Sequence, residues 1–180
     1  TMKQLLCLAL LAGLAGCAGS LPPGAVPVEN FNLDRYLGDW YEIARLDHSF
    51  ERGLSRATAN YSINKDGSVR VVNRGYQEDK KKWKEAVGKA KFVGDQSVGR
   101  LKVSFFGPFY GGYNIIDLDE AYSRVLICSN STKYLWILAR EPRLPDEVLT
   151  QLVEKARALN FPVDELIYVD QSPVPEPPAR

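Results

Sequence analysis

The stretch Gly38-Asp39-Trp40-Tyr41-Glu42-Ile43-Ala44 decides the fold that we expect for this chain. Its side chains alternate, with Trp40 and Glu42 on one face and Tyr41 and Ile43 on the other. A two-residue period of this kind is typical of a β-strand with two different faces. Trp40 is large enough to fill one end of a closed structure, but a core tryptophan in an ordinary β-sandwich explains this stretch equally well.

Seven further strand-like runs follow at short spacing, separated by Gly, Pro, Asp, Asn or Ser. The turn Asn64-Lys65-Asp66-Gly67 sets an Asp-Gly pair between two alternating runs, which is a strong hairpin signal. The runs together cover residues 40–46, 56–63, 68–76, 82–92, 100–106, 113–118, 122–129 and 133–140. The connections are short and contain no helix, so the sequence predicts an all-β fold, an eight-stranded up-and-down antiparallel barrel. Closure removes exposed edges and leaves room for one small ligand.

One amphipathic helix is expected after the barrel, at about residues 145–159. Its apolar side chains recur at helical spacing and form a single stripe, which needs an apolar partner. If Trp136 points into the barrel, then Leu135 and Ile137 in the same strand point outward. We therefore expect the helix to pack on the outer wall at the last strand.

The first residues resemble the export signal of a bacterial lipoprotein. Their apolar run is too short to span a bilayer as a helix. The stretch Leu14-Ala15-Gly16-Cys17 resembles a lipobox, which implies that residues 1–16 are removed and that Cys17 is lipidated. An ordinary secretory signal with a chance cysteine is the alternative.

The residue after the lipidation site bears on the membrane to which the chain goes. Two or three acyl chains on Cys17 would anchor the chain stably. Because Ala18 is not the aspartate that retains lipoproteins in the inner membrane, the resemblance implies the bacterial outer membrane, with the protein on its periplasmic face. Residues 17–30 suit a tether and residues 171–180 a Pro-rich tail, which leaves residues 31–170 for the barrel and helix.

Composition limits the remaining classes of protein. A chain of 180 residues with a net charge of +1 fits one domain, and no basic stripe favours nucleic-acid binding. Three cysteines, of which only Cys128 lies in the expected fold, rule out a disulfide framework within the chain. His48 is the only histidine, and we expect no metal site, no cofactor and no Ser-His-Asp arrangement.

Three motifs, in order and at barrel spacing, resemble those of the lipocalin family. They are Gly38-Asp39-Trp40-Tyr41 in the first strand, the stretch 113–122 around the sixth turn, and the stretch 135–140, which ends in Arg140. The resemblance covers about residues 31–169 and is closest to the bacterial outer-membrane members, with apolipoprotein D a relative.

The family pattern implies that Arg140 lies over Trp40 beside Gly38. A guanidinium stacked on an indole contributes about 0.5–2 kcal/mol, and here it would join the first strand to the last. We interpret these residues as structural closure rather than ligand contacts.

The expected ligand-binding residues lie above that closure. Alternation in the fifth strand puts Leu101, Val103 and Phe105 on one apolar face, which should line the cavity. Tyr113 and Trp136 are the inward aromatic residues at positions where family members contact ligand. For each of these residues, simple filling of the core is the alternative.

Two polar residues complete the expected site. Asn60 matches a polar pocket position of the apolipoprotein D branch, although apolarity alone favours Tyr61 as the inward residue. Arg52 lies in the first large loop, which crosses the barrel mouth in this family. It could meet the head group of an amphiphile, and a solvated loop is the alternative.

The sequence therefore predicts an outer-membrane-anchored lipocalin that binds, stores or transports a fatty acid or lysophospholipid, without catalysis. The competing hypothesis is a lipid-modifying enzyme of the cell envelope on the same scaffold. Cys128 would be its nucleophile, although an inert strand thiol fits better. An interaction module with a self-filled barrel is a third hypothesis. The sequence leaves open the ligand, the direction of transport and whether the chain forms homodimers.

Overall fold

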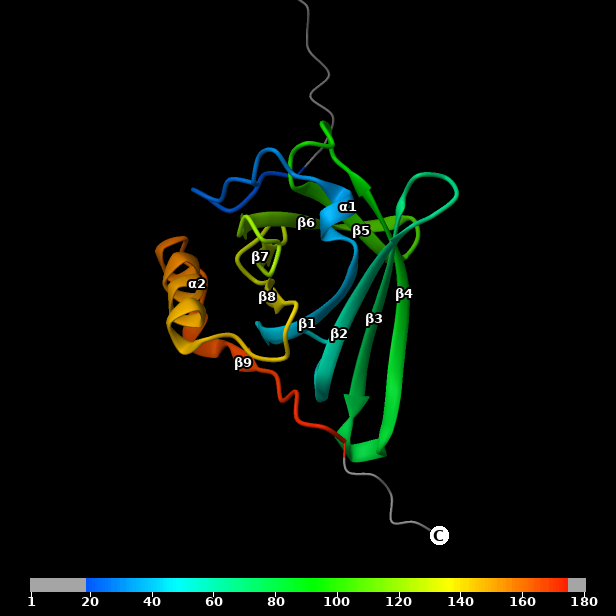
Figure 1. The fold of residues 1–180 in the computed structure, drawn as a ribbon, viewed down its shortest axis with the longest axis vertical. Helices are drawn as coiled ribbons and strands as arrows, with labels where there is room; N and C mark the ends of the chain where they lie inside the picture. The colour runs from blue at the N-terminus through cyan, green and yellow to red at the C-terminus, as the bar shows by residue number, and fades with distance from the viewer. Residues whose placement is uncertain (1–18, 175–180) are drawn as a thin grey trace, which may run out of the picture.

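Eight antiparallel strands close into a barrel in the computed structural model, which describes residues 19–174 (Figure 1). The strands are β1 (Gly38–Arg45), β2 (Leu54–Ile63), β3 (Val69–Gln77), β4 (Lys82–Phe92), β5 (Arg100–Phe106), β6 (Phe109–Leu118), β7 (Arg124–Cys128) and β8 (Leu135–Ala139). Consecutive strands pair, and β1 pairs with both β2 and β8, which closes the barrel. The predicted barrel is confirmed. The predicted signal, Cys17 and the end of the tail lie outside the described residues.

The remaining elements lie at the ends of the barrel and on its outer wall. They are α1 (Leu33–Tyr36), η1 (Glu78–Lys80), α2 (Asp146–Ala158), η2 (Val163–Glu165) and β9 (Ile167–Tyr168). The end that carries α1 is called the base here, and the end that carries the β1–β2 and β3–β4 connections is called the mouth (Figure 1). Within residues 19–174, no helix is long and apolar enough to cross a membrane.

The helix α2 packs outside the barrel, as predicted. Its buried residues Leu152 and Ala156 share an apolar cluster with Leu135 and Ile137, which point outward from β8. Figure 1 shows α2 beside β7 and β8. Residues of alternate parity in the same strands face inward, so the wall separates two cores.

A β-bulge in β1 alters the alternation that the sequence predicts. The pairing with β8 shifts between Glu42 and Ala44, so that Arg45 pairs with the inward residue Trp136. Ala44 belongs to the outer cluster beside α2. The predicted face of Trp40, Glu42 and Ala44 is therefore correct only up to Glu42, because one extra residue exchanges the two faces of the strand.

The two segments flanking the barrel contact it more closely than predicted. In the expected tether, Val28 accepts a hydrogen bond from the amide of Gly99 and donates one to the carbonyl of Ile115. In the expected tail, the Gln171 side chain donates to two carbonyls, those of Glu42 and Ala57. These contacts give hydrogen-bond partners to backbone groups of the barrel.

Candidate functional site

The base of the barrel is closed around Trp40, which is fully buried. The Arg140 guanidinium lies 4.0 Å from the centroid of its indole ring, and the indole Nε1 donates a 2.9 Å hydrogen bond to the Tyr36 carbonyl. Gly38 has a φ of +95°, a backbone conformation that residues with a Cβ rarely adopt. The structure thus brings together the three residues that the sequence assigns to closure.

Three tyrosine hydroxyls form a chain above Trp40. The hydroxyl oxygens of Tyr36 and Tyr113 lie 2.6 Å apart, and Tyr113 donates to Tyr61 at 2.7 Å. Burial raises the pKa of all three phenols, so they stay protonated. Tyr113 therefore points inward, as predicted, and is held by two polar partners inside an apolar cluster.

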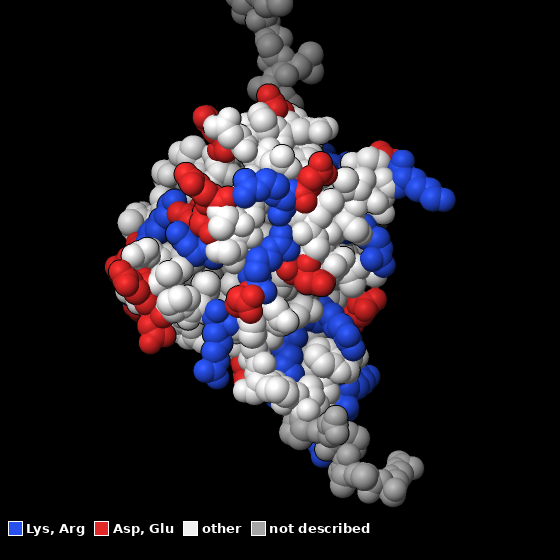
Figure 2. All heavy atoms as spheres, viewed as in Figure 1, with Lys and Arg blue, Asp and Glu red and all other residues white. Residues whose placement is uncertain are grey.

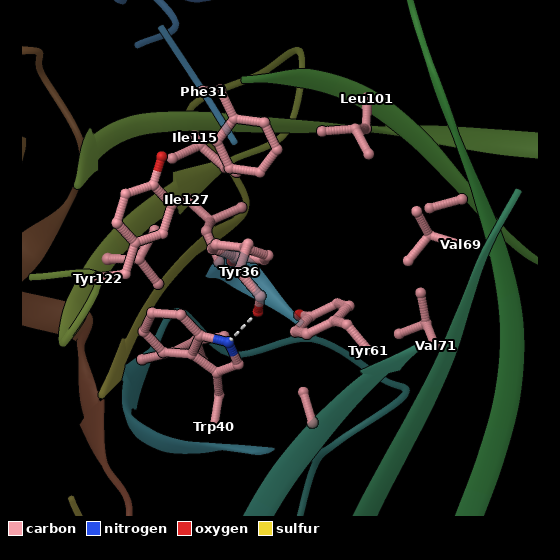
Figure 3. Close-up of a cluster of buried hydrophobic side chains, with 14 residues drawn as sticks. Phe31, Tyr36, Trp40, Tyr61, Val69, Val71, Leu101, Ile115, Tyr122 and Ile127 are labelled. Carbon is pink, nitrogen blue, oxygen red and sulfur yellow. Dashed lines mark hydrogen bonds between the residues drawn. The ribbon is translucent and has the colours of Figure 1, made fainter. Parts of the chain in front are cut away.

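The barrel wall formed by β3 and β5 is apolar on its inner face. Leu101, Val69 and Val71 point into the barrel across from Tyr122 and Ile127 (Figure 3). Exposure along β5 increases toward the mouth. Its inward residues pass from Leu101, which is almost fully buried, to Val103 and Phe105, which are partly buried; all three belong to the inner cluster. The inward face of β5 is therefore covered less completely toward the mouth, and the side chains left partly uncovered there are apolar.

Charged residues are buried against the wall formed by β1 and β8. Arg45 donates a 2.6 Å hydrogen bond to Glu42, and both side chains are almost completely buried. Arg45 also donates to the backbone carbonyls of Glu51 and Leu54. One guanidinium thus ties the β1–β2 loop to the barrel wall through three acceptors.

The same loop contributes a second buried contact. His48 Nε2 lies 2.7 Å from Glu51 Oε2, and the indole Nε1 of Trp136 donates to that oxygen at 3.1 Å. Trp136 packs against the inner cluster. We call Glu42, Arg45, His48, Glu51 and Trp136 the polar cluster.

The pKa values of the two carboxyl groups in the polar cluster are shifted in opposite directions. Burial, and then the charge of Glu51, raises the pKa of Glu42 well above its usual range. Burial also acts to raise the pKa of Glu51, but His48, Trp136 and Arg45 outweigh it and hold that pKa low. The Nε of Arg45 and both ring nitrogens of His48 have no hydrogen-bond partner of good geometry among the described residues, although His48 Nε2 lies close to Glu51. The polar cluster therefore holds a buried donor without a partner, the Nε of Arg45, beside an apolar interior.

Two of the predicted ligand residues are not brought to this interior. Asn60 donates to the Asp39 carboxylate in an exposed position, while its neighbours Ala59 and Tyr61 face inward. Arg52 is largely exposed and pairs with Asp47 at 2.6 Å. Both placements depart from the predicted site, because strand parity turns Asn60 outward and a local ion pair holds Arg52 in solvent.

The residues that sequence reasoning missed are Glu42 and Arg45. Glu42 shares the predicted face of Trp40, whereas the inward direction of Arg45 depends on the bulge in β1. One signal was present, since Glu42 and Arg45 are opposite charges within a run whose other members, from Trp40 to Leu46, are apolar. Charges in such a run are usually paired when they are buried.

Groups that could support catalysis are few in the described part of the chain. Cys128 points away from the interior into the cluster beneath α2, and burial raises the pKa of its thiol to about 12. No group of three or more His, Cys, Asp or Glu residues within 19–174 could hold a metal ion. On the face shown in Figure 2, basic and acidic side chains are interspersed.

Comparison with known proteins identifies the family of this chain. A model of the lipocalin-like domain matches residues 31–171. Outer membrane lipoprotein Blc of Vibrio cholerae is 51% identical to this chain, and the matched region covers 88% of this chain and 92% of the relative. Outer membrane lipoprotein Blc of Citrobacter freundii is 50% identical, and the matched region covers 88% of this chain and 90% of the relative. Bovine apolipoprotein D is 34% identical, and the matched region covers 96% of this chain and 97% of the relative.

Solved structures agree with the fold. Insecticyanin from the tobacco hornworm Manduca sexta has a TM-score of 0.67 at 19% identity, covering 85% of this chain and 87% of its own. The family-model match, residues 31–171, extends from the segment just before α1 to the segment just beyond β9. With the family model covering most of the chain and close relatives over nearly its full length, this chain belongs to the lipocalin family.

Proposed function

We propose that this lipocalin binds, stores or transports a single-chain amphiphilic lipid, a fatty acid or a lysophospholipid, inside the barrel. The observation that carries this proposal is the inward face of β5, where Val103 and Phe105 are only partly buried although they point into the barrel. Each methylene removed from water contributes about 0.8 kcal/mol, so an acyl chain can reach micromolar affinity by burial alone.

The polar cluster supports a ligand with a polar head. The buried Nε of Arg45 lies beside the hydrocarbon wall, where a head group could accept a hydrogen bond from it. This assignment replaces Arg52, which faces solvent. The ligand would thus lie with its chain against β5 and its head toward the β1–β2 loop.

We further propose that the protein is anchored to the outer membrane through lipidated Cys17, on the periplasmic face. The lipobox-like stretch before Cys17 supports this, as does the name outer membrane lipoprotein carried by relatives about half identical to this chain. A chain with Cys17→Ser should leave the membrane fraction, and a labelled palmitate precursor should fail to enter it. Unchanged sedimentation with membranes would contradict the anchor.

Binding is tested by titrating palmitate and a lysophospholipid while following Trp fluorescence. Val103→Glu places a charge on the inward face and should weaken binding more than about tenfold, since the charge loses its solvation. Lys102→Glu, one residue away on the outward face, is the matched control and should bind within about twofold of the wild type. Equal effects of the two changes would contradict binding inside the barrel.

Native mass spectrometry of the purified protein separates carriage from the alternatives. A bound, chemically unchanged acyl chain is the expected result. Turnover of the lipid that disappears in Cys128→Ala would instead favour a lipid-modifying enzyme. A barrel that holds no lipid and does not bind palmitate would instead favour a protein-interaction module.

A further inference from the structure

We propose that the outer face of the barrel carries a second binding site, which takes a phosphate-bearing ligand in a groove between β4 and β5. The groove has a volume of about 360 Å³ and is lined in part by Arg70, Lys89, Ser104 and Val87. Its polar side chains lie on the outer face of the wall, and the ring of Phe105 borders both the groove and the interior. The second site does not depend on the proposed lipid binding.

The groove forms where two paired strands separate. The ladder between β4 and β5 runs only from Phe92 to Lys89, although β4 continues to Lys82. Figure 1 shows β4 following β3 toward the mouth beyond that point. Between Lys82 and Gly88, β4 therefore has no backbone pairing with β5, and side chains of both strands border the groove there.

Three side chains form a row across the paired strands at the edge of the groove. Arg70 of β3 pairs in register with Lys89 of β4, and Lys89 pairs with Ser104 of β5. Two cations directly opposite each other on neighbouring strands repel. Asp66 offsets only one of them, because its carboxylate lies 2.8 Å from Lys89 Nζ.

The charge on Arg70 is left without a counter-ion. Its guanidinium makes no hydrogen bond or ion pair with the residues described between 19 and 174. An anion in the groove would relieve the repulsion between Arg70 and Lys89 and would accept hydrogen bonds from the guanidinium.

Ser104 gives an independent indication of a ligand. It is only 7% exposed, and its hydroxyl has no hydrogen-bond partner among the described residues, although it lines the groove. A buried hydroxyl without a partner is unfavourable and uncommon in folded proteins. A ligand oxygen in the groove would supply the missing partner.

The chemistry of the groove defines the class of ligand. A phosphate monoester has several oxygens and can accept from Arg70, Lys89 and Ser104 together. The half-exposed side chain of Val87 and the ring of Phe105 add apolar surface beside these donors. The groove thus suits a phosphate joined to a small organic group, as in a lipid head group, or free phosphate.

The test uses the mature chain from residue 17 with Cys17→Ser, titrated with glycerol phosphate and followed by amide NMR. Glycerol phosphate has no acyl chain to enter the barrel. We expect saturable shifts at the amides of Lys89 and Ser104, with a dissociation constant of about 1–10 mM, because solvent screens the charges. Tighter binding of glycerol phosphate than of inorganic phosphate would identify a lipid head group; equal binding would identify free phosphate as the ligand.

Matched variants locate the site. Arg70→Gln should weaken binding at least about fivefold and Ser104→Ala about twofold, through the loss of a charged and a neutral donor. Lys91→Gln, two residues along β4 from Lys89, should have no effect. Absence of saturable shifts at about 20 mM, or equal losses in Arg70→Gln and Lys91→Gln, would overturn the proposal.

The outcome is separable from lipid binding in the barrel. Arg70→Gln should bind palmitate as the wild type does, because Arg70 points away from the interior while Val69 and Val71 point into it. If Arg70→Gln weakened palmitate and glycerol phosphate equally, the groove would not be a separate site. If the wild type bound glycerol phosphate but not palmitate, the proposed lipid binding would be overturned and the second site would stand.

Discussion

The guanidinium of Arg140 lies 4.0 Å from the ring centroid of Trp40 and donates hydrogen bonds to the backbone carbonyls of Tyr36 and Leu37 at the end of α1. It also donates to the Asp39 carbonyl in β1 at 2.7 Å. A single side chain that follows β8 therefore holds β1 and the helix that covers the base. The planar fork of donors makes this possible, because a lysine ammonium presents no such geometry.

Replacing Arg140 should destabilise the protein. Arg140→Ala removes the stacking and several charged hydrogen bonds, so we expect the free energy of unfolding to fall by about 2–4 kcal/mol in a urea titration. Arg140→Lys should recover only part of this loss. Arg143→Ala, an exposed arginine three residues on, serves as the control. An unchanged unfolding midpoint in Arg140→Ala would refute the closing role.

Removing one hydroxyl should reveal the tyrosine chain. In Tyr113→Phe the hydroxyls of Tyr36 and Tyr61 each lose a buried partner, which should cost about 1–2 kcal/mol of unfolding free energy. Tyr168→Phe removes an exposed hydroxyl and should be neutral. Thermal unfolding of both variants makes the comparison, and equal midpoints would argue that the chain adds nothing to stability.

Glu42 should make stability depend on pH. Its pKa is raised in the folded state, so above about pH 4.5 the unfolded chain has lost a proton that the folded chain retains. Stability then falls as the pH rises, by at most about 1.4 kcal/mol per pH unit. Glu42→Gln should abolish this slope between pH 4.5 and the raised pKa.

The opposite shift of Glu51 acts in a different pH window. Its lowered pKa makes stability fall as the pH drops below about 4.5, so the two effects do not overlap. Unfolding free energies measured at several pH values for wild type and Glu42→Gln give the difference directly. A difference that stays constant above pH 4.5 would contradict the raised pKa of Glu42.

Gly88 should tolerate no side chain. A Cβ there would lie 2.8 Å from the Phe105 ring and 2.9 Å from the Ser104 carbonyl oxygen, and the backbone oxygen cannot easily move. Gly88→Ala should therefore cost about 1–3 kcal/mol of unfolding free energy. Gly111→Ala in β6 meets nothing within 4 Å and is the control. Similar urea midpoints for the two variants would contradict this steric role.

The Cys128 thiol should be unreactive in the folded protein. With a pKa of about 12, only about one thiol in ten thousand is ionised at pH 8, and the side chain is buried. In the mature chain with Cys17→Ser, Cys128 is the one remaining cysteine, so a thiol reagent reports on it alone. Rapid labelling without denaturant would revive Cys128 as a candidate nucleophile.

The sequence by itself determined the order of the strands, the barrel and the outer helix. Hydrophobic alternation gave the faces of β5 correctly, because that strand is regular where Leu101 and Val103 lie. Short polar turns and one amphipathic stripe left few other topologies. The pairing of Arg140 with Trp40 was also visible, because the family pattern sets one motif in the first strand and another at the end of the last.

Only the tertiary structure decided which polar residues enter the interior. Alternation assigns a face only while a strand is regular, and the bulge after Glu42 turned Arg45 inward and Ala44 outward. For Asn60 the phase was open until its neighbour Tyr61 was found in the core. A loop arginine such as Arg52 has no period at all, so its partner depends on contacts that form only on folding.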